Sequence, residues 1–410
     1  MKSRRHGSRL CAAVLTAALA ASLRSVAAQE PPTDPAQALA LEHSDALPIT
    51  KFYDAPADLR ASRPGDLLRS ERFAGYTLPQ GASAVRILYH SRDAEGRSVA
   101  TSGVVLTPAG KPPATGWPII AWAHGTSGVA RLCAPSAMKD VYYGDEGLYA
   151  MLKAGYAVVA TDYHGLGTAG PHQYVNKIAQ ANDVIYSIPA ARAAVPSLGR
   201  RWVVDGHSQG GLAAWGVAEA EAILKDPNYL GAVSVAGATH LEGLLTDLAK
   251  AEGAGFYMPF IAYGVAARFP DFRPETMLSD AALAHYGDVT SKGCWYYAYA
   301  RYAGAAPGSM MKAGWNELPD VKAFVAESRT TEKPVAGPIF VIAGEADRSV
   351  AISGVRATVA SACRKRMNVR FRSYPGLDHD PTMMNSMPDQ IAWIGDRFAG
   401  KPATGNCPSK

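Results

Sequence analysis

A serine flanked by glycines stands between an apolar strand and a helix built of small residues. Residues 202–204 are apolar, residues 206–210 have the pattern Gly-x-Ser-x-Gly, and residues 211–218 carry mostly small side chains. The serine of such a unit occupies a sharp turn, where any side chain on the flanking glycines would collide with the backbone. The pattern therefore predicts a strand-turn-helix unit that presents Ser208 as a nucleophile, in preference to an ordinary glycine-rich turn.

Short apolar segments alternate with helical segments through most of the chain, and this alternation indicates the fold class. The predicted strands are 117–123, 156–160, 202–205, 232–236, 339–343 and 369–373, and the predicted helices include 179–194, 349–366 and 389–398. Such an order is typical of a mostly parallel sheet with helices on both faces, that is, an α/β fold. Apolar and polar side chains alternate within residues 83–107, on both sides of a turn at 93–96, and this pattern predicts an antiparallel hairpin.

One interval interrupts this alternation. Residues 239–333 have no strand pattern and are crowded with aromatic side chains, among them Phe256, Trp295 and Tyr299. We predict a helical cap, or lid, inserted into a core whose two parts are residues 49–238 and 334–410. For any single aromatic, packing inside the cap is the simpler interpretation, but together they would make a wall for an apolar substrate above Ser208.

The N-terminal segment has the features of a secretory signal peptide. Four basic residues precede an apolar stretch at 10–23, and small residues end at Ala28. We predict a signal peptide over residues 1–28, cleaved after Ala28, and a secreted or periplasmic protein. Residues 29–48 are rich in Pro, Ala and acidic side chains, which predicts a flexible leader.

The charge balance excludes a basic surface as the defining property of the mature chain. The net charge of +5 comes from 41 basic and 36 acidic residues, but residues 1–28 contain five of the basic residues and none of the acidic ones. The remaining chain has 36 of each sign. We therefore expect no nucleic-acid partner, and charge indicates no anionic membrane partner.

Four cysteines remain after the predicted cleavage, namely Cys133, Cys294, Cys363 and Cys407. An even number in an oxidising compartment predicts two disulfides, but four cysteines allow three pairings and spacing does not choose among them. No Cys-x-x-Cys pair and no Cys/His pair at ligand spacing occurs, so we predict no metal site.

A serine nucleophile needs a histidine base and an acid that orients the imidazole, in the chain order Ser, acid, His for this type of unit. Only His240, His285 and His379 follow Ser208, and the first two lie in the predicted cap. His379 follows the last strand in a predicted loop, so it is the expected base.

The acid should stand at the end of a late strand. Asp347 follows the strand at 339–343 and is the predicted acid, with Glu345 as the alternative. Asp378 and Asp380 flank His379 so closely in sequence that bridging to its ring would be awkward.

A tetrahedral intermediate also needs amide donors for its oxyanion. Gln209, directly after the nucleophile, is the first expected donor. The second should come from the loop at 123–128, where Thr126 is favoured and Ser127 is nearly as good a candidate. The histidines before Ser208 in these motifs, namely His124, His164 and His207, are expected to be structural because they precede the nucleophile.

With these motifs in order, the chain resembles the secretory lipase family, the fungal lipase A type of α/β-hydrolase that also has many bacterial members. The matching segments are Phe52–Tyr53, 63–69, 123–128, 133–136, 162–167 and 205–211. The resemblance implies an α/β-hydrolase fold with a Ser208, Asp347 and His379 triad, an oxyanion hole at Gln209 and the Thr126 to Ser127 turn, and a lid between sheet strands. It also implies pairing of Cys133 with Cys294 and of Cys363 with Cys407.

These features favour a secreted serine carboxylic-ester hydrolase, a lipase or esterase acting on apolar acyl or aryl esters through an acyl-enzyme intermediate without cofactor or metal. The expected partner is a small-molecule or lipid ester, with transient contact at a lipid interface allowed. A serine peptidase or amidase of the same fold is the first alternative. A non-catalytic ligand-binding module is the second, although a binder would have no need of all three triad residues.

Overall fold

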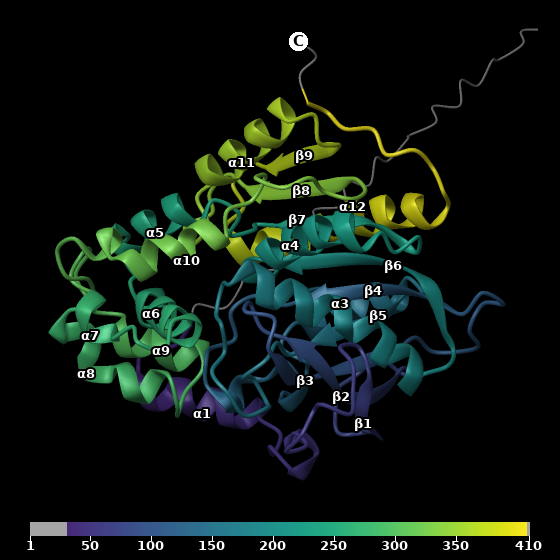
Figure 1. Ribbon diagram of the computed structural model, residues 1–410, viewed down its shortest axis with the longest axis horizontal. Helices are drawn as coiled ribbons and strands as arrows, with labels where there is room; N and C mark the ends of the chain where they lie inside the picture. Colours follow the sequence, from purple (N-terminus) through teal and green to yellow (C-terminus); the bar gives the residue numbers. More distant parts are fainter. Residues whose placement is uncertain (1–30, 408–410) are drawn as a thin grey trace, which may run out of the picture.

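The computed structural model describes residues 31–407, and its centre is a nine-stranded sheet with the order β1-β2-β3-β5-β4-β6-β7-β8-β9 (Figure 1). The strands are β1 (Leu67–Arg72), β2 (Ser83–Arg92), β3 (Ser98–Thr107), β4 (Trp117–Ala123), β5 (Ala157–Thr161), β6 (Leu198–His207), β7 (Tyr229–Val235), β8 (Ile339–Gly344) and β9 (Val369–Tyr374). The six strands β4 to β9 pair in parallel, whereas β1, β2 and β3 pair antiparallel. The predicted α/β fold with a mostly parallel sheet is confirmed.

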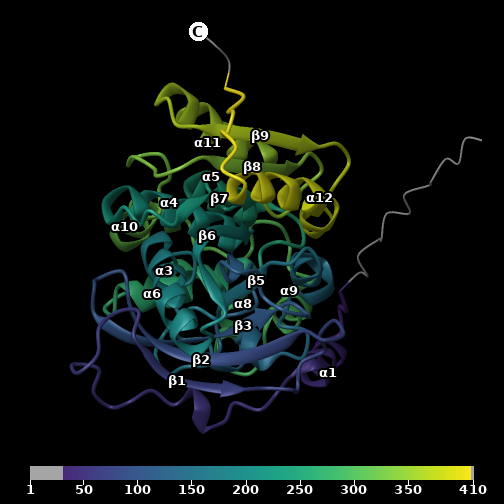
Figure 2. The same cartoon turned by 90° about the vertical axis from the view of Figure 1, so that its right-hand side faces the viewer.

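Helices cover both faces of the sheet. The helices of the described chain are α1 (Pro35–Asp45), α2 (Tyr149–Lys153), α3 (Lys177–Ala194), α4 (Gln209–Leu224), α5 (Leu241–Lys250), α6 (Tyr257–Arg268), α7 (Pro274–Met277), α8 (Asp280–Val289), α9 (Trp295–Tyr302), α10 (Pro319–Glu327), α11 (Ile352–Arg364) and α12 (His379–Phe398). Along β4, Ile119 and Ala121 pack into the core shared with α3 and α4, whereas Ile120 and Trp122 pack on the opposite side with α2 and α12. In Figure 2, α3 and α4 lie to the left of β6 and β7, and α12 lies to the right. Alternating side chains of one strand thus fill two separate layers, which explains why β4, β5, β7 and β8 are largely apolar.

The antiparallel edge was foreseen only in part. The predicted hairpin is confirmed, with β2 and β3 paired from Ser83 and Thr107 to Arg92 and Ser98. The sequence analysis missed β1, whose residues Leu-Leu-Arg-Ser-Glu-Arg are at least partly exposed throughout. Such an edge strand shows no clear apolar alternation, because only its pairing with β2 makes it a strand.

The interval between β7 and β8 is helical, as predicted, and holds α5 to α10; we call residues 239–333 the cap. Its apolar side chains form their own cluster, which includes Phe260, Ile261 and Phe324. Val129 and Leu212 of the core join the same cluster, so the cap is packed directly onto the body that carries Ser208. In Figure 1 the helices α6 to α9 form one side of the molecule.

The prediction of a flexible leader over 29–48 is wrong for the greater part of that segment. Residues 35–45 form α1, which lies beside α9 (Figure 1). The physical reason is Glu42, whose carboxylate accepts hydrogen bonds from the Cys294 amide at 2.9 Å and the Tyr297 amide at 2.8 Å. Cys294, the N-cap residue of α9, makes no side-chain capping hydrogen bond. Glu42, from a distant segment of the chain, caps the start of α9 instead. The predicted signal peptide lies outside the described residues.

Both disulfides implied by the family resemblance are present. Cys133 is bonded to Cys294 and Cys363 to Cys407, closing separations of 161 and 44 residues. The first ties the loop after β4 to the start of α9 in the cap, and the second ties α11 to the C-terminal segment. None of the described helices is long and apolar enough to cross a membrane.

We predict that the Cys133→Ala/Cys294→Ala double variant loses about 2–5 kcal/mol of unfolding free energy, measured by urea denaturation. The Cys363→Ala/Cys407→Ala double variant is the control. Its loop is shorter, so its loss should be smaller by about 1 kcal/mol on chain-entropy grounds. Equal losses, or the reverse order, would contradict the loop-closure explanation.

Candidate active site

Ser208 occupies a strained turn between β6 and α4. Its backbone has φ 59° and ψ −118°, a conformation that a non-glycine residue adopts only when its surroundings enforce it. The Ser208 amide donates to the Val235 carbonyl at 2.9 Å on the neighbouring strand β7, which fixes the turn against the sheet. The structure thus has the sharp turn that the glycine pattern predicts.

The two glycines of the motif are in close contact with backbone. A Cβ atom on Gly210 would lie 1.8 Å from the carbonyl oxygen of Ala123, and one on Gly206 would lie 2.2 Å from the carbonyl oxygen of Gly210. Neither neighbour is the flexible end of a side chain, so no small rearrangement could admit a methyl group. The absence of both side chains lets α4 begin directly against the end of β4.

We predict that Gly210→Ala lowers the unfolding free energy by at least about 3 kcal/mol, because overpacking here forces the backbone of β4 or α4 to move. The matched control is Gly287→Ala in α8, where a Cβ would meet nothing within 4 Å. That substitution should be neutral or stabilising by about 0.5–1 kcal/mol. Thermal and urea unfolding of the two variants test the contrast, and similar midpoints for both would refute it.

His379 and Asp347 are brought together from two different elements. His379 Nδ1 lies 2.8 Å from Asp347 Oδ2, and Asp347 follows β8 in a loop whose Ser349 and Val350 amides donate to its other oxygen at 2.9 and 2.7 Å. The carboxylate is thereby oriented before it meets the imidazole. Glu345, the alternative acid, instead accepts a hydrogen bond from the Ser373 hydroxyl at 2.7 Å.

The surroundings of His379 differ in one respect from the sequence-based expectation. The residue is the first of α12, which begins ten positions before the predicted helix at 389–398, and so it does not lie in a loop. Asp378 acts as the N-cap, accepting from the His379 amide at 2.8 Å and pairing with Arg348 at 2.7 Å. A helix start holds the imidazole more rigidly than a loop would, and it commits Asp378 to capping.

The second ring nitrogen of His379, Nε2, lies near the turn that carries Ser208, which we call the Ser208 elbow. His379 Nε2 is buried and has no hydrogen-bond partner in the described part of the chain, and its ring lies 4.5 Å from the ring of His207, centroid to centroid. His207 directly precedes Ser208. No hydrogen bond joins Ser208 to His379 among the described residues, which is common before substrate binds.

Burial and acidic neighbours act in opposite directions on the imidazole. Burial lowers the pKa of His379, but the Asp347 carboxylate and, to a lesser degree, Asp380 and Asp378 outweigh it and raise the pKa to about 9. The pKa values of two carboxyl groups, those of Glu146 and Asp380, are raised as well. Burial and the charge of Asp380 raise the pKa of Glu146 to about 8, and burial raises the pKa of Asp380.

The pH dependence of hydrolysis follows from this shift. A histidine base works only when neutral, so a pKa raised above 6.5 to about 9 moves the rise in kcat/KM toward alkaline pH. In Asp347→Asn, loss of the carboxylate should move the midpoint of that rise about 1–3 units lower and reduce kcat about 10⁴-fold. Profiles of kcat/KM against pH for both proteins provide the measurement, and an unmoved midpoint would show that Asp347 does not control the base.

The loop after β4 passes directly beside Ser208. A Cβ on Gly125 would meet the Tyr143 hydroxyl at 2.3 Å and Ser208 Cβ at 3.3 Å. Thr126 follows, and its hydroxyl is 2.7 Å from that of Tyr174 while its carbonyl accepts from the Tyr142 hydroxyl. The sequence analysis did not single out Gly125, although a glycine in this loop is the signal that could have pointed to so close a contact.

Ser127 is tied to the cap rather than to the nucleophile. Its hydroxyl donates to the Cys133 carbonyl at 2.8 Å, and its own carbonyl accepts from the Trp295 amide at 2.9 Å at the start of α9. Of the two candidates for the second oxyanion donor, Thr126 is therefore the one adjacent to the residue that touches Ser208. The disulfide and this backbone bond together link the loop to the cap.

Gln209 begins α4, and its side chain is held by a histidine that the sequence analysis did not identify. Gln209 Nε2 lies 3.2 Å from His172 Nε2, and His172 Nδ1 lies 2.9 Å from the His164 carbonyl. Because an amide NH₂ can only donate, His172 accepts at Nε2 and donates from Nδ1. Burial lowers the pKa of His172 to about 3, which keeps it in this neutral form.

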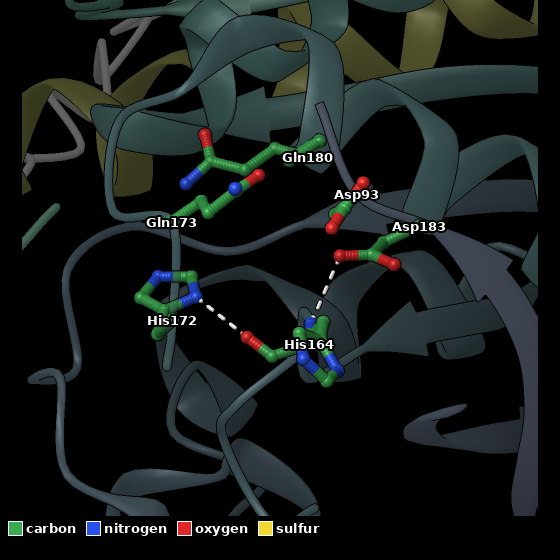
Figure 3. Close-up of a pocket in the computed structure, with 7 residues that line it drawn as sticks. Asp93, His164, His172, Gln173, Gln180 and Asp183 are labelled. Carbon is green, nitrogen blue, oxygen red and sulfur yellow. Dashed lines mark hydrogen bonds between the residues drawn. The ribbon is translucent and has the colours of Figure 1, made fainter. Parts of the chain in front are cut away.

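Figure 3 shows the small polar cavity behind this contact, where His172 and His164 lie below Asp183 and Gln180. Asp183 accepts hydrogen bonds from the His164 amide and from the hydroxyls of Ser91 and Thr101. His164 is thus structural, as expected. His124 is fully buried between the Gly125 and Asp162 carbonyls, at 2.6 and 3.1 Å, and is structural as well.

Comparison with known proteins identifies the family. The sequence model of the secretory lipase family matches residues 138–406. The chain belongs to the secretory lipase family. Family membership makes it a carboxylic ester hydrolase, and both the family and the two disulfides agree with an extracellular protein.

Two curated relatives and two solved structures show how far the likeness extends. Lipase 6 of Candida albicans (strain SC5314 / ATCC MYA-2876) is 24% identical over 400 residues, covering 87% of this chain and 82% of that protein. The probable inactive lipase MT1628 of Mycobacterium tuberculosis (strain CDC 1551 / Oshkosh) is 23% identical over 376 residues, covering 86% and 82%. Candida antarctica lipase A in its closed state matches with a TM-score of 0.73 at 18% identity, covering 88% of this chain and 91% of that one. The rice cell wall degrading esterase LipA from Xanthomonas oryzae matches with a TM-score of 0.69 at 19% identity, covering 83% and 99%.

Proposed function

We propose that this secretory lipase family member is a secreted serine esterase or lipase that hydrolyses apolar acyl or aryl esters through a covalent acyl-enzyme. The observation that carries the proposal is the Asp347–His379 hydrogen bond of 2.8 Å, which leaves the opposite nitrogen of the imidazole unpartnered beside the Ser208 elbow. One curated relative is named a probable inactive lipase, so the proposal rests on the side chains present in this chain. This chain has Ser208, Asp347 and His379, the three side chains that the proposed reaction needs.

The reaction follows from the roles that these groups can take. Neutral His379 accepts the Ser208 proton at Nε2 as the hydroxyl oxygen attacks the ester carbonyl carbon, and Asp347 stabilises the imidazolium that forms. The amides of Gln209 and Thr126 then stabilise the oxyanion. Collapse of the tetrahedral intermediate breaks the ester C–O bond, and His379 returns the proton to the departing alcohol. Water, deprotonated by His379 in turn, releases the acid and restores Ser208.

The cap supplies the apolar environment that such esters need. Phe256, Tyr257, Trp295 and Tyr299 form a contiguous aromatic cluster, with Trp295 and Tyr299 stacked at 5.5 Å. Trp295 Nε1 donates to the Tyr257 hydroxyl at 3.0 Å, so both polar groups are satisfied within the cluster. We infer that residues 239–333 act as a lid, because only 9% of Ser208 is exposed while these helices pack against the core.

The test compares wild type with Ser208→Ala on p-nitrophenyl esters from acetate to palmitate. We expect Ser208→Ala to lose about 10⁴–10⁶-fold in kcat. A fluorophosphonate should add one covalent label to wild type and to Ser44→Ala, an exposed serine control on α1, but none to Ser208→Ala, as measured by intact mass.

The outcomes separate the remaining alternatives. A preference for short esters identifies an esterase with a narrow pocket, whereas rates that increase with chain length identify a lipase. Labelling of Ser208 without ester turnover would favour a peptidase or amidase of the same fold. Neither labelling nor turnover would leave a ligand-binding module and contradict the proposal. N-terminal sequencing of the exported protein tests cleavage after Ala28.

A further inference from the structure

Three potential metal ligands converge at the catalytic histidine. One ring nitrogen each from His207 and His379 and a carboxylate oxygen of Asp380 lie within 4.8 Å of one another. Among residues 31–407, this is the one group of three or more such side chains whose ligand atoms lie so close together. The three residues come from the end of β6 and the start of α12, two elements that are adjacent only in the folded chain.

Both imidazoles are oriented in the way that metal-binding histidines are oriented. His379 uses Nδ1 in its hydrogen bond to Asp347, and His207 Nδ1 lies 3.0 Å from the Tyr143 hydroxyl. A partner on one ring nitrogen fixes the ring and leaves the other nitrogen for a ligand. Both remaining Nε2 atoms are buried and have no hydrogen-bond partner in the described part of the chain.

An unpartnered buried nitrogen on two adjacent rings calls for an explanation. His207 is fully buried and His379 is 8% exposed, so water cannot freely satisfy either Nε2 atom. Catalysis accounts for the one on His379, since Ser208 or a leaving group uses it in the reaction. It does not account for the one on His207, which precedes the nucleophile and has no role in the proposed steps. A cation bridging both nitrogens would satisfy them together.

The donor set selects the kind of cation. Two imidazole nitrogens and one carboxylate oxygen are ligands typical of zinc, and three protein ligands with an open fourth position form a known zinc arrangement. Zinc bonds of about 2.0–2.2 Å place tetrahedral ligand atoms about 3.4 Å apart, so shifts under about 1 Å per side chain bring the three into range. Magnesium and calcium prefer all-oxygen ligands and octahedral or larger shells, which this group does not offer.

We propose that a zinc ion binds His379 Nε2, His207 Nε2 and the Asp380 carboxylate and thereby switches the esterase off reversibly. The metal occupies the lone pair that His379 needs to accept the Ser208 proton, so zinc binding and catalysis exclude each other. Zinc here is a regulatory ligand and not a cofactor. The inhibition depends on the proposed esterase function, whereas the binding site itself does not.

No sequence pattern indicates this site. Metal motifs are recognised by ligands at short fixed spacing, and here two ligands are adjacent in the chain while the third is more than a hundred and seventy positions away. The prediction of no metal rested on that spacing rule. The packing of His207 against His379, with ring centroids at 4.5 Å, is what creates the cluster.

Binding is measured first, on Ser208→Ala without a polyhistidine tag, by calorimetric titration with zinc chloride and by competition with a chromogenic chelator. We expect one zinc ion per chain, and affinity at least about tenfold weaker after His207→Gln or Asp380→Asn in the same background. Tyr143→Phe, which removes the partner of His207 Nδ1, should weaken binding less. His43→Gln, at an exposed histidine, is the matched control and should bind as the parent does.

Inhibition is measured second, on the active enzyme with p-nitrophenyl butyrate at one fixed pH, because protons compete with zinc for imidazole. Zinc should inhibit and EDTA should restore the rate, while magnesium at the same concentration should have no effect. Each variant's rate is divided by its own rate without zinc. On this scale, the zinc concentration that gives half inhibition should increase at least about tenfold for His207→Gln and Asp380→Asn.

Each outcome decides the proposal. No stoichiometric zinc binding to Ser208→Ala, or binding that His207→Gln and Asp380→Asn leave unchanged, overturns it. Inhibition that all variants share would place zinc elsewhere and also overturn it. Zinc binding that follows the variants in a protein without ester turnover would support the site while refuting the proposed function, so the two failures are distinguishable.

Discussion

The contact between Gly210 and the end of β4 governs the geometry of the whole site. With no side chain on Gly210, α4 starts so close to β4 that an added Cβ would lie 1.8 Å from the Ala123 carbonyl oxygen. This close approach leaves the intervening Ser208 in its strained conformation, and the surrounding sheet supplies the stability that such a backbone requires. The same β4 continues into the loop carrying Gly125 and Thr126, so one packing contact positions both Ser208 and a candidate oxyanion donor.

A second set of constraints connects this loop with the cap and with α1. The Cys133–Cys294 disulfide and the Trp295 amide bonded to the Ser127 carbonyl fix the start of α9 beside the loop. Glu42 then caps α9 from α1. The cap is therefore attached on the side of the oxyanion loop, and any opening motion would have to be hinged there or occur in the helices farther along the cap.

The acidic surroundings of His379 have two consequences. Asp347, with help from Asp378 and Asp380, favours the imidazolium form of His379, so the neutral form that the proposed base needs prevails only at alkaline pH. The same acidic side chains, next to a second buried imidazole on His207, make surroundings suited to a cation. A site arranged to stabilise a transient proton on His379 is thus also arranged to hold a metal ion there.

The sequence by itself determined the elements whose signals are local. The Ser208 elbow, the parallel strands and the strand-free cap follow from glycine spacing and apolar periodicity, and chain order distinguished His379 from the cap histidines. Tertiary structure alone decided the rest, because the deciding partners are distant in sequence. Glu42 orders α1 by capping α9, pairing with β2 makes β1 a strand, and His172 contacts the Gln209 side chain directly. His207 and Asp380 meet His379 only because β6 and α12 pack together, and hydrogen bonds and ligand contacts across such distances leave no period or spacing to detect.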